Sequence, residues 1–267
     1  MQIVGQMRVC VCGGLPWRGG GFGIIRGVVI GTKTQGESKN ERWAYLLAGP
    51  TASGKSAIAA ELAREMGAWI LSADSMLVYR GMDIGTAKPP PEEIAEFHMG
   101  GVDLVTPAEE FSSGAWLRAA AEWASAVPAD VPIVIVGGTG LYFSALLRGL
   151  DRRWEKPPPE YPVISIDRAV VRARIAARLD VMFMAGLEEE KRRLRAEYPV
   201  WSRTAALAIG YREGDDRAKI LTRTCQLAKR QDTWFRHQAT PLYVEPTVEG
   251  VRDCWNRHGP WPVRFMV

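Results

Sequence analysis

The sequence lacks several features that define special classes of protein. No apolar run approaches the roughly 18–20 residues that a membrane-spanning helix requires, so we expect no membrane partner. Cysteine is scarce, and Cys10, Cys12, Cys225 and Cys254 are too few in 267 residues to indicate a disulfide scaffold. The pair Cys10 and Cys12 has the spacing of half a metal site, but no second Cys or His pair lies near it in the sequence. We therefore expect free thiols and a cytoplasmic location.

Charge of either sign is modest overall, because the formal net charge is +4, but it is unevenly distributed. Residues 168–236 contain 16 Lys and Arg against 9 Asp and Glu, a local charge of +7 that leaves −3 for the rest of the chain. A basic half beside a nearly neutral half is typical of a protein that binds a polyanion. A set of solvated helix faces would give the same count, so charge alone leaves both interpretations open.

Residues 1–42 differ from the rest of the sequence. They contain ten glycines and no sustained apolar period, and glycine loses the most conformational entropy on ordering, so a packed face is not expected. We interpret them as a disordered extension or as a translation start assigned too far upstream. The remaining sequence is expected to form one domain over 43–245, followed by a C-terminal tail at 246–267.

Within that domain, short apolar segments alternate with helical patterns. The segments predicted to be strands are 43–49, 68–74, 102–107, 131–138 and 163–167. The segments predicted to be helices are 56–67, ended by Gly67, then 111–127, capped by Ser112 or Ser113, then 141–150, and 168–198, broken near Gly186. This alternation predicts an α/β fold: a P-loop-type parallel sheet with helices on both faces and a largely helical C-terminal part. Ligands of such sheets bind at the carboxyl ends of the strands.

One such end carries a phosphate-binding loop with the spacing G-x-x-x-x-G-K-[ST], which follows a strand and opens a helix. The loop consists of Gly49, Pro50, Thr51, Ala52, Ser53, Gly54, Lys55 and Ser56. Its backbone N–H groups would bind phosphate oxygens, Lys55 would add a positive charge, and Ser56 would ligate Mg²⁺. Asp74 follows the next strand. Three interpretations of this residue are open: it caps a turn, it is the acid that receives the substrate of a nucleotide kinase, or it is a general base.

The sequence around Asp74 narrows these alternatives. "DSMLVYRGMDIGTAKP" (74–89) closely resembles the segment that follows the second strand in tRNA dimethylallyltransferases. Other stretches resemble the same family in the same order and span most of residues 44–245. They are "GPTASGKS" (49–56), "VGGTGLYFSALLRGL" (136–150), the Arg-rich 168–189, "IGYRE" (209–213) and "QLAKRQDTWFR" (226–236).

The resemblance implies a reaction and a set of site residues. Family members transfer a dimethylallyl group from dimethylallyl diphosphate to N6 of adenine 37, beside the tRNA anticodon, and release diphosphate. By resemblance, Asp74 is the base, and Lys55, Thr51 and Arg168, with Arg174 and a Mg²⁺ on Ser56, stabilise the departing diphosphate. The positions that match family contacts to the tRNA anticodon stem-loop are Asp74, Ser75, Met76, Leu77, Thr139, Leu207, Ala208, Ile209, Gly210, Tyr211 and Arg212. A monomer is expected.

The sequence departs from the family in one respect. Family members carry a long helical insertion that clasps the anticodon stem, whereas here only about residues 151–162 bridge the same gap. We therefore expect a lower affinity for tRNA and a smaller effect on the transfer reaction itself. Two alternatives stay open: a small-molecule or nucleotide kinase that binds ATP on this loop, although no separate Arg-rich lid is evident, and a non-catalytic RNA-binding relative. Retention of Asp74, Lys55 and Arg168 argues against the second.

Overall fold

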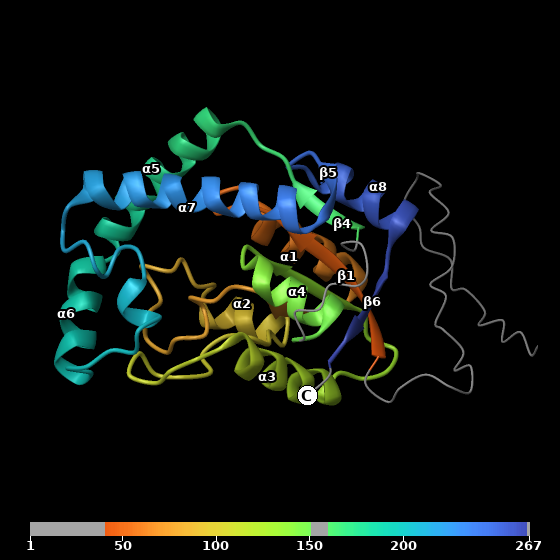
Figure 1. Cartoon of the computed structure of the whole chain (residues 1–267), viewed down its shortest axis with the longest axis horizontal. Coiled ribbons are helices and arrows are strands. Elements are labelled where there is room, and N and C mark those ends of the chain that lie inside the picture. Colours follow the sequence, from red (N-terminus) through yellow and green to blue (C-terminus); the bar gives the residue numbers. More distant parts are fainter. Residues whose placement is uncertain (1–40, 151–159, 266–267) are drawn as a thin grey trace, which may run out of the picture. The chain divides into compact units, whose positions relative to one another are not determined.

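The computed structural model describes residues 41–150 and 160–265 (Figure 1). Residues 1–40 of the expected Gly-rich extension at 1–42, and residues 151–159 of the expected bridge at 151–162, lie outside the described ranges. The first described strand begins two residues before the predicted domain start at 43, because Glu41 and Arg42 pair with the last strand of the sheet. None of the helices in the described ranges is both long and apolar enough to cross a membrane.

A parallel sheet forms the centre of the domain. Its strands are β1 (Glu41–Ala48), β2 (Trp69–Ser72), β3 (Ile133–Gly137), β4 (Glu160–Ile164) and β5 (Thr240–Val244), in the order β2-β3-β1-β4-β5. All five residues of β3 are buried, as expected of a central parallel strand covered on both faces. A sixth strand, β6 (Trp261–Arg264), runs antiparallel to the first half of β1.

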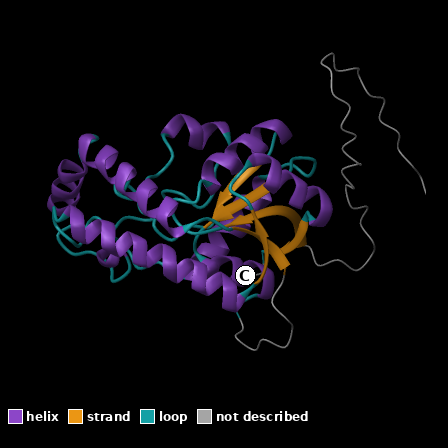
Figure 2. Cartoon of the chain, turned by 90° about the horizontal axis from the view of Figure 1, so that it is seen from above, coloured by secondary structure: helices purple, strands orange, loops and turns teal. Residues whose placement is uncertain are grey.

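Helices cover both faces of this sheet, as the sequence predicts (Figure 2). The helices that pack on it are α1 (Lys55–Met66), α3 (Ser113–Ala126), α4 (Gly140–Arg148) and α8 (Val248–His258); a short α2 (Pro91–Glu96) lies in the β2–α3 connection. The β1–β2 and β3–β4 connections run in opposite directions along the sheet, so right-handed crossovers place α1 and α4 on opposite faces. Accordingly, α3 packs against α4, and α8 packs against α1.

Three helices continue beyond the sheet and carry most of the basic residues. They are α5 (Arg168–Met184), α6 (Leu187–Glu197) and α7 (Arg217–Gln238). The predicted break between the first two is confirmed, because Gly186 takes a left-handed conformation with φ of 97°. Both α5 and α6 lie away from the strands in the two cartoons, whereas α7 packs along α5 and returns to contact α4 and β5 (Figures 1 and 2).

Two sequence predictions need correction. The expected strand at 102–107 is wrong: the segment is a loop in which Leu104 N and Val105 N both donate to Val78 O. Asp103 adopts φ of 50°, which interrupts an extended strand, and Pro107 ends the segment. Residues 246–267, expected as a tail, contain α8 and β6, and Val251 and Val263 are fully buried in the main core.

Two tryptophans link this core to the backbone of the sheet. Trp116 of α3 stacks on Tyr142 at 4.2 Å between ring centroids, and its Nε1 donates to Ser72 O at 3.1 Å. Trp255 of α8 donates from Nε1 to Leu46 O at 2.8 Å. A buried indole with its N–H paired contributes apolar area without an unsatisfied donor. Trp116 therefore fixes the carboxyl end of β2, two residues before Asp74.

Candidate active site

The phosphate loop connects β1 to α1 in the order that the sequence predicts. Ala52 and Gly54 both take left-handed conformations, with φ of 61° and 92°. Gly54 adopts this geometry readily because it lacks a Cβ atom, and Ala52 adopts it as a buried residue of the loop. Gly54 caps α1 without a side-chain hydrogen bond, so the N–H groups at the start of the helix are available to an anion.

Lys55 lies inside the loop rather than on its surface. The residue is 8% exposed, and its Nζ donates to Pro50 O at 3.2 Å. Burial lowers the pKa of Lys55 to about 8; Asp74 opposes this effect, and Arg178 adds to it. A bound diphosphate would supply the negative charge that stabilises the ammonium form, so Lys55 is placed to favour an anionic ligand in the loop.

The arginines of α5 are arranged differently from the expectation. Arg174 lies against the phosphate loop, where its Nη1 donates to Ser53 O at 3.1 Å. Arg178, one turn later, lines the cavity described below, although the sequence indicates only that it belongs to a basic helix. Arg168 is the exposed first residue of α5 and lines neither of the two cavities. A direct catalytic role for Arg168 thus has no support from this geometry.

Asp74 is held in a turn at the carboxyl end of β2. Its Oδ1 accepts from Met76 N at 2.8 Å, and among the described residues its Oδ2 has no protein hydrogen-bond partner. Thr139, which follows β3, accepts from Ser75 N at 2.9 Å and donates to Ser75 Oγ at 3.2 Å. The Thr139 N–H also donates to Ala73 O. The two strand ends are therefore tied together, with one carboxylate oxygen of Asp74 left for a ligand.

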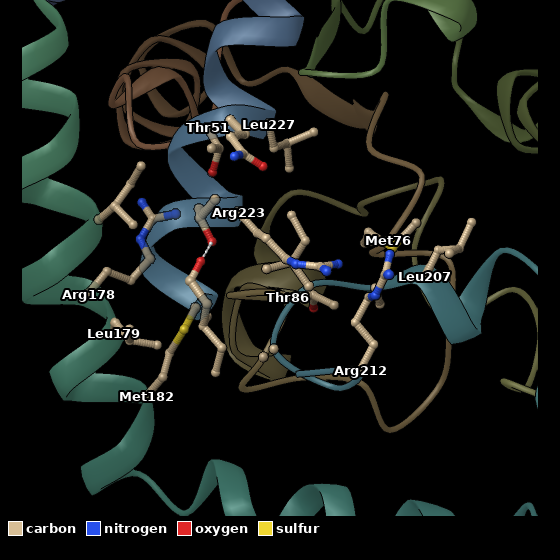
Figure 3. Close-up of a pocket in the computed structure, with 18 of the residues that line it drawn as sticks. Thr51, Met76, Thr86, Arg178, Leu179, Met182, Leu207, Arg212, Arg223 and Leu227 are labelled. Carbon is tan, nitrogen blue, oxygen red and sulfur yellow. Dashed lines mark hydrogen bonds between the residues drawn. The ribbon is translucent and has the colours of Figure 1, made fainter. Parts of the chain in front are cut away.

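A cavity of about 1010 Å³ joins these elements (Figure 3). The expected site residues that line it are Thr51, Asp74, Ser75, Met76, Thr139, Leu207, Ala208, Ile209, Gly210 and Arg212. A second cavity of about 140 Å³ shares Thr51, Asp74 and Arg178 with the first and contains Lys55, Ser56 and Leu77. Tyr211 lines neither cavity and is 1% exposed, so it lies behind the cavity wall, and the structure does not support the expected direct contact of its side chain with tRNA.

The walls of the large cavity differ in chemistry. Ile175, Leu179 and Met182 of α5 and Leu227 of α7 form an apolar side. Arg178, Arg212, Arg223 and Arg230 also line it. The Arg212 and Arg223 side chains extend toward the same part of the cavity (Figure 3). Both pair with the buried carboxylate of Glu213, whose Oε1 lies 3.5 Å from Arg212 Nε and 3.2 Å from Arg223 Nη1. The cavity can therefore accept a ligand with both an apolar and an anionic part.

Gln231 of α7 is a site residue that the sequence does not predict. Its Oε1 accepts from Thr51 N at 2.8 Å, and its Nε2 donates to Gly138 O at 3.0 Å. The side chain thus bridges the phosphate loop and the turn after β3. Its place in the block "QLAKRQDTWFR" is the only sequence signal for this role, because its partners lie 180 and 93 residues away along the chain.

The phosphate loop presents N–H groups and a buried lysine opposite a carboxylate at the neighbouring strand end. This arrangement is typical of P-loop enzymes that act on phosphorylated substrates. Comparison with known proteins specifies the family. The family described as isopentenyl transferase matches residues 42–99, and that described as IPP transferase matches residues 77–162 and 151–238. The chain is a member of the tRNA dimethylallyltransferase family and is therefore a prenyltransferase.

Curated relatives support this assignment over most of their length. The chain is 36% identical to the tRNA dimethylallyltransferase of Thioalkalivibrio sulfidiphilus, over 72% of this chain and 87% of the relative. It is 32% identical to that of Stenotrophomonas maltophilia, over 78% of this chain and 94% of the relative. The first alignment runs over 280 positions although it includes only 72% of 267 residues, so the relative has a large segment without a counterpart here. The reduced insertion at about 151–162 stays a prediction, because the lengths alone do not place this segment in the sequence.

Solved structures confirm the fold. The tRNA isopentenylpyrophosphate transferase of Staphylococcus epidermidis superposes with a TM-score of 0.68 at 23% identity, over 79% of this chain and 97% of that one. The enzyme of Bacillus halodurans gives the same TM-score at 24% identity, over 80% of this chain and 94% of that one. At these identities the likeness shows a common fold alone.

Proposed function

We propose that the chain transfers the dimethylallyl group of dimethylallyl diphosphate to N6 of adenine 37 in the tRNA anticodon stem-loop, and releases diphosphate. The observation that carries this proposal is the sharing of one cavity by the phosphate loop, Asp74 and an apolar wall. A nucleotide kinase would need the loop and an acid, but it would not need an apolar wall beside them.

The diphosphate binds in the phosphate loop. Backbone N–H groups from the loop and the start of α1 bind its oxygens, and Lys55 adds a positive charge. Arg178 faces the same ligand from α5, and Arg174 supports the loop from behind. The dimethylallyl group packs against the side of the cavity formed by Ile175, Leu179 and Met182.

Asp74 acts as the general base. The N6 nitrogen of adenine forms a bond to C1 of the dimethylallyl group while the C1–O bond breaks. The electron pair of the C1–O bond leaves with the diphosphate. Asp74 Oδ2 takes the proton from N6, because Oδ1 is already held by Met76 N. Negative charge grows on the departing diphosphate, so the cations and N–H groups of the loop stabilise the transition state more than the bound substrate.

The donor set also fits Mg²⁺. Ser56 and Asp74 line the smaller cavity together with Lys55. The described residues contain no group of three His, Cys, Asp or Glu side chains that could hold a metal ion by themselves. Mg²⁺ commonly takes one or two protein ligands and completes its shell with substrate phosphates and water. Ser56 would hold it, and the ion would supply positive charge to the diphosphate.

The tRNA supplies the acceptor base from the open side of the large cavity. Arg212, Arg223 and Arg230 lie where phosphates of the anticodon loop would approach. Adenine 37 enters the cavity between the segment around Met76 and the segment around Ile209. The chain is expected to act in the cytoplasm as a monomer. Sedimentation of the purified protein, with and without RNA, would test its oligomeric state.

The direct test is a transfer assay with an anticodon stem-loop RNA. The purified protein, dimethylallyl diphosphate and Mg²⁺ should convert A37 to N6-dimethylallyladenosine, detected by mass spectrometry of the nucleosides. An RNA with G37 should give no product, and the Asp74→Asn variant should bind the diphosphate without transfer. RNA binding without any product from the wild-type protein would favour the non-catalytic alternative, and phosphoryl transfer from ATP to a nucleoside would favour the kinase.

A further inference from the structure

Glu190 of α6 is a buried acid that the proposed reaction does not use. The residue is 5% exposed, and its carboxylate accepts hydrogen bonds from four donors. Oε2 accepts from Asp83 N at 3.1 Å and from Ile84 N at 2.8 Å. Oε1 accepts from Gly85 N at 3.1 Å and from the Tyr211 hydroxyl at 2.6 Å. A buried carboxylate with this many partners fixes the position of each of them.

Three of these donors are successive backbone N–H groups, which together form a concave anion-binding nest. Glu190 fills this nest with a side chain of the protein itself, so the nest is not a substrate site. The residues at its edge face the active site instead: Gly85 and Thr86 line the large cavity, and Thr86 also lines the smaller one. The position of Glu190 therefore determines where this wall stands.

The fourth donor connects the nest to a second wall. Tyr211 lies between Gly210 and Arg212, both of which line the large cavity. Burial raises the pKa of the Tyr211 hydroxyl, and the negative charge of Glu190 raises it further, so the group remains a hydrogen-bond donor at neutral pH. The Tyr211 ring also packs so closely on Gly85 that an added Cβ would lie 2.5 Å from the ring. One carboxylate thus holds two walls of the cavity in register.

We propose that Glu190 is a positioning residue for prenyl transfer: it clamps the segment 83–86 against the segment 208–212 and so sets the opening through which the acceptor base reaches Asp74. This inference rests on the proposed function. Glu190 lines neither of the two cavities, and the phosphate loop is held separately, by Arg174 and Gln231. Loss of the clamp should therefore impair use of the RNA while leaving the diphosphate in place.

The Glu190→Gln variant tests the clamp with almost no change in shape. A glutamine amide nitrogen cannot accept a hydrogen bond, so at least one pair of the four donors loses its acceptor. We expect kcat/KM for the stem-loop RNA to fall roughly 10–100-fold, as for a misplaced substrate-positioning group, and the Kd of dimethylallyl diphosphate to stay within about twofold. Hydrogen exchange at the amides of residues 83–85 should accelerate at the same time. Glu189→Gln, an exposed neighbour paired only with Arg192 at the surface, is the matched control and should leave all three quantities unchanged.

Two further variants keep the test decisive where Glu190→Gln does not fold. Gly85→Ala leaves Glu190 intact but pushes the wall away from the Tyr211 ring, and Tyr211→Phe removes a single hydrogen bond. Both should lower kcat/KM for RNA, Gly85→Ala more strongly, with diphosphate affinity preserved. Wild-type kcat/KM in these folded variants, or an equal loss of affinity for the diphosphate, would overturn the clamp. A wild-type protein that makes no product would instead overturn the proposed function, so the two failures are distinguishable.

Discussion

The state of Lys55 makes diphosphate binding pH-dependent in a direction that the structure determines. In the empty site, burial lowers the pKa of Lys55 to about 8, with Arg178 acting in the same direction and Asp74 against it. A bound diphosphate stabilises the ammonium form, so the pKa of Lys55 rises in the complex. As pH rises through the pKa of the empty site, binding requires uptake of a proton, and affinity falls.

The size of the effect follows from this shift. If the complex retains a pKa near the ordinary lysine value, the apparent Kd should rise roughly tenfold between pH 7 and pH 9, or about 1.4 kcal/mol. The terminal phosphate of the ligand contributes little in this window, because its last ionisation lies near pH 6. The unfolding free energy of the empty protein should move the opposite way. The folded state binds fewer protons at Lys55 than the unfolded state between pH 8 and about 10, so stability from this group increases with pH there.

Calorimetric titration with a non-reactive thiolo analogue of dimethylallyl diphosphate would measure the binding profile. Lys55→Met should bind more weakly and lose the pH dependence above pH 7, whereas Lys229→Met, an exposed lysine of α7, should keep the wild-type profile. A flat profile in the wild-type protein, or the same slope in Lys55→Met, would refute the reasoning. The first result would mean that Lys55 remains fully charged in the empty site, and the second that another group titrates.

Three further predictions follow from the site. Asp74→Asn should lower kcat by roughly 10²–10⁴ in the transfer assay with unchanged diphosphate affinity, and near-normal turnover would remove Asp74 from the role of base. Gln231→Ala should raise KM for dimethylallyl diphosphate by about tenfold, because Thr51 N and Gly138 O lose their shared partner; Lys229→Ala is the control, and equal KM values would contradict the bridge. In a salt series, log K against log salt for tRNA should be shallower than in a relative with the full insertion, by roughly 0.7–0.9 per lost phosphate contact, whereas an equal slope would mean that another part of the chain replaces the insertion.

Much of the fold could be predicted because the signals are local. The apolar run of β3, the glycine at position 67 and the break at Gly186 each reflect a few adjacent residues, and the structure confirms all three. The segment 102–107 shows the limit of this reasoning. Its apolar residues suggest a strand, but the segment makes only one isolated β-bridge, between Val105 and Tyr79, and pairs with no strand of the sheet, which no local pattern can show.

The sequence by itself determined the phosphate loop, the position of Asp74 and the family, because those depend on the order and spacing of residues within short blocks. Tertiary structure decided which distant side chains serve that loop. It placed Arg174 and Arg178 at the site and Arg168 outside it, since a helix that starts at the sheet edge brings only some of its turns to the loop. It also brought Gln231 to Thr51 across 180 residues and Glu190 to the nest at 83–85 across more than 100. Contacts of this kind form only when packing closes long loops of chain, and the residues involved carry no local sign of their partners.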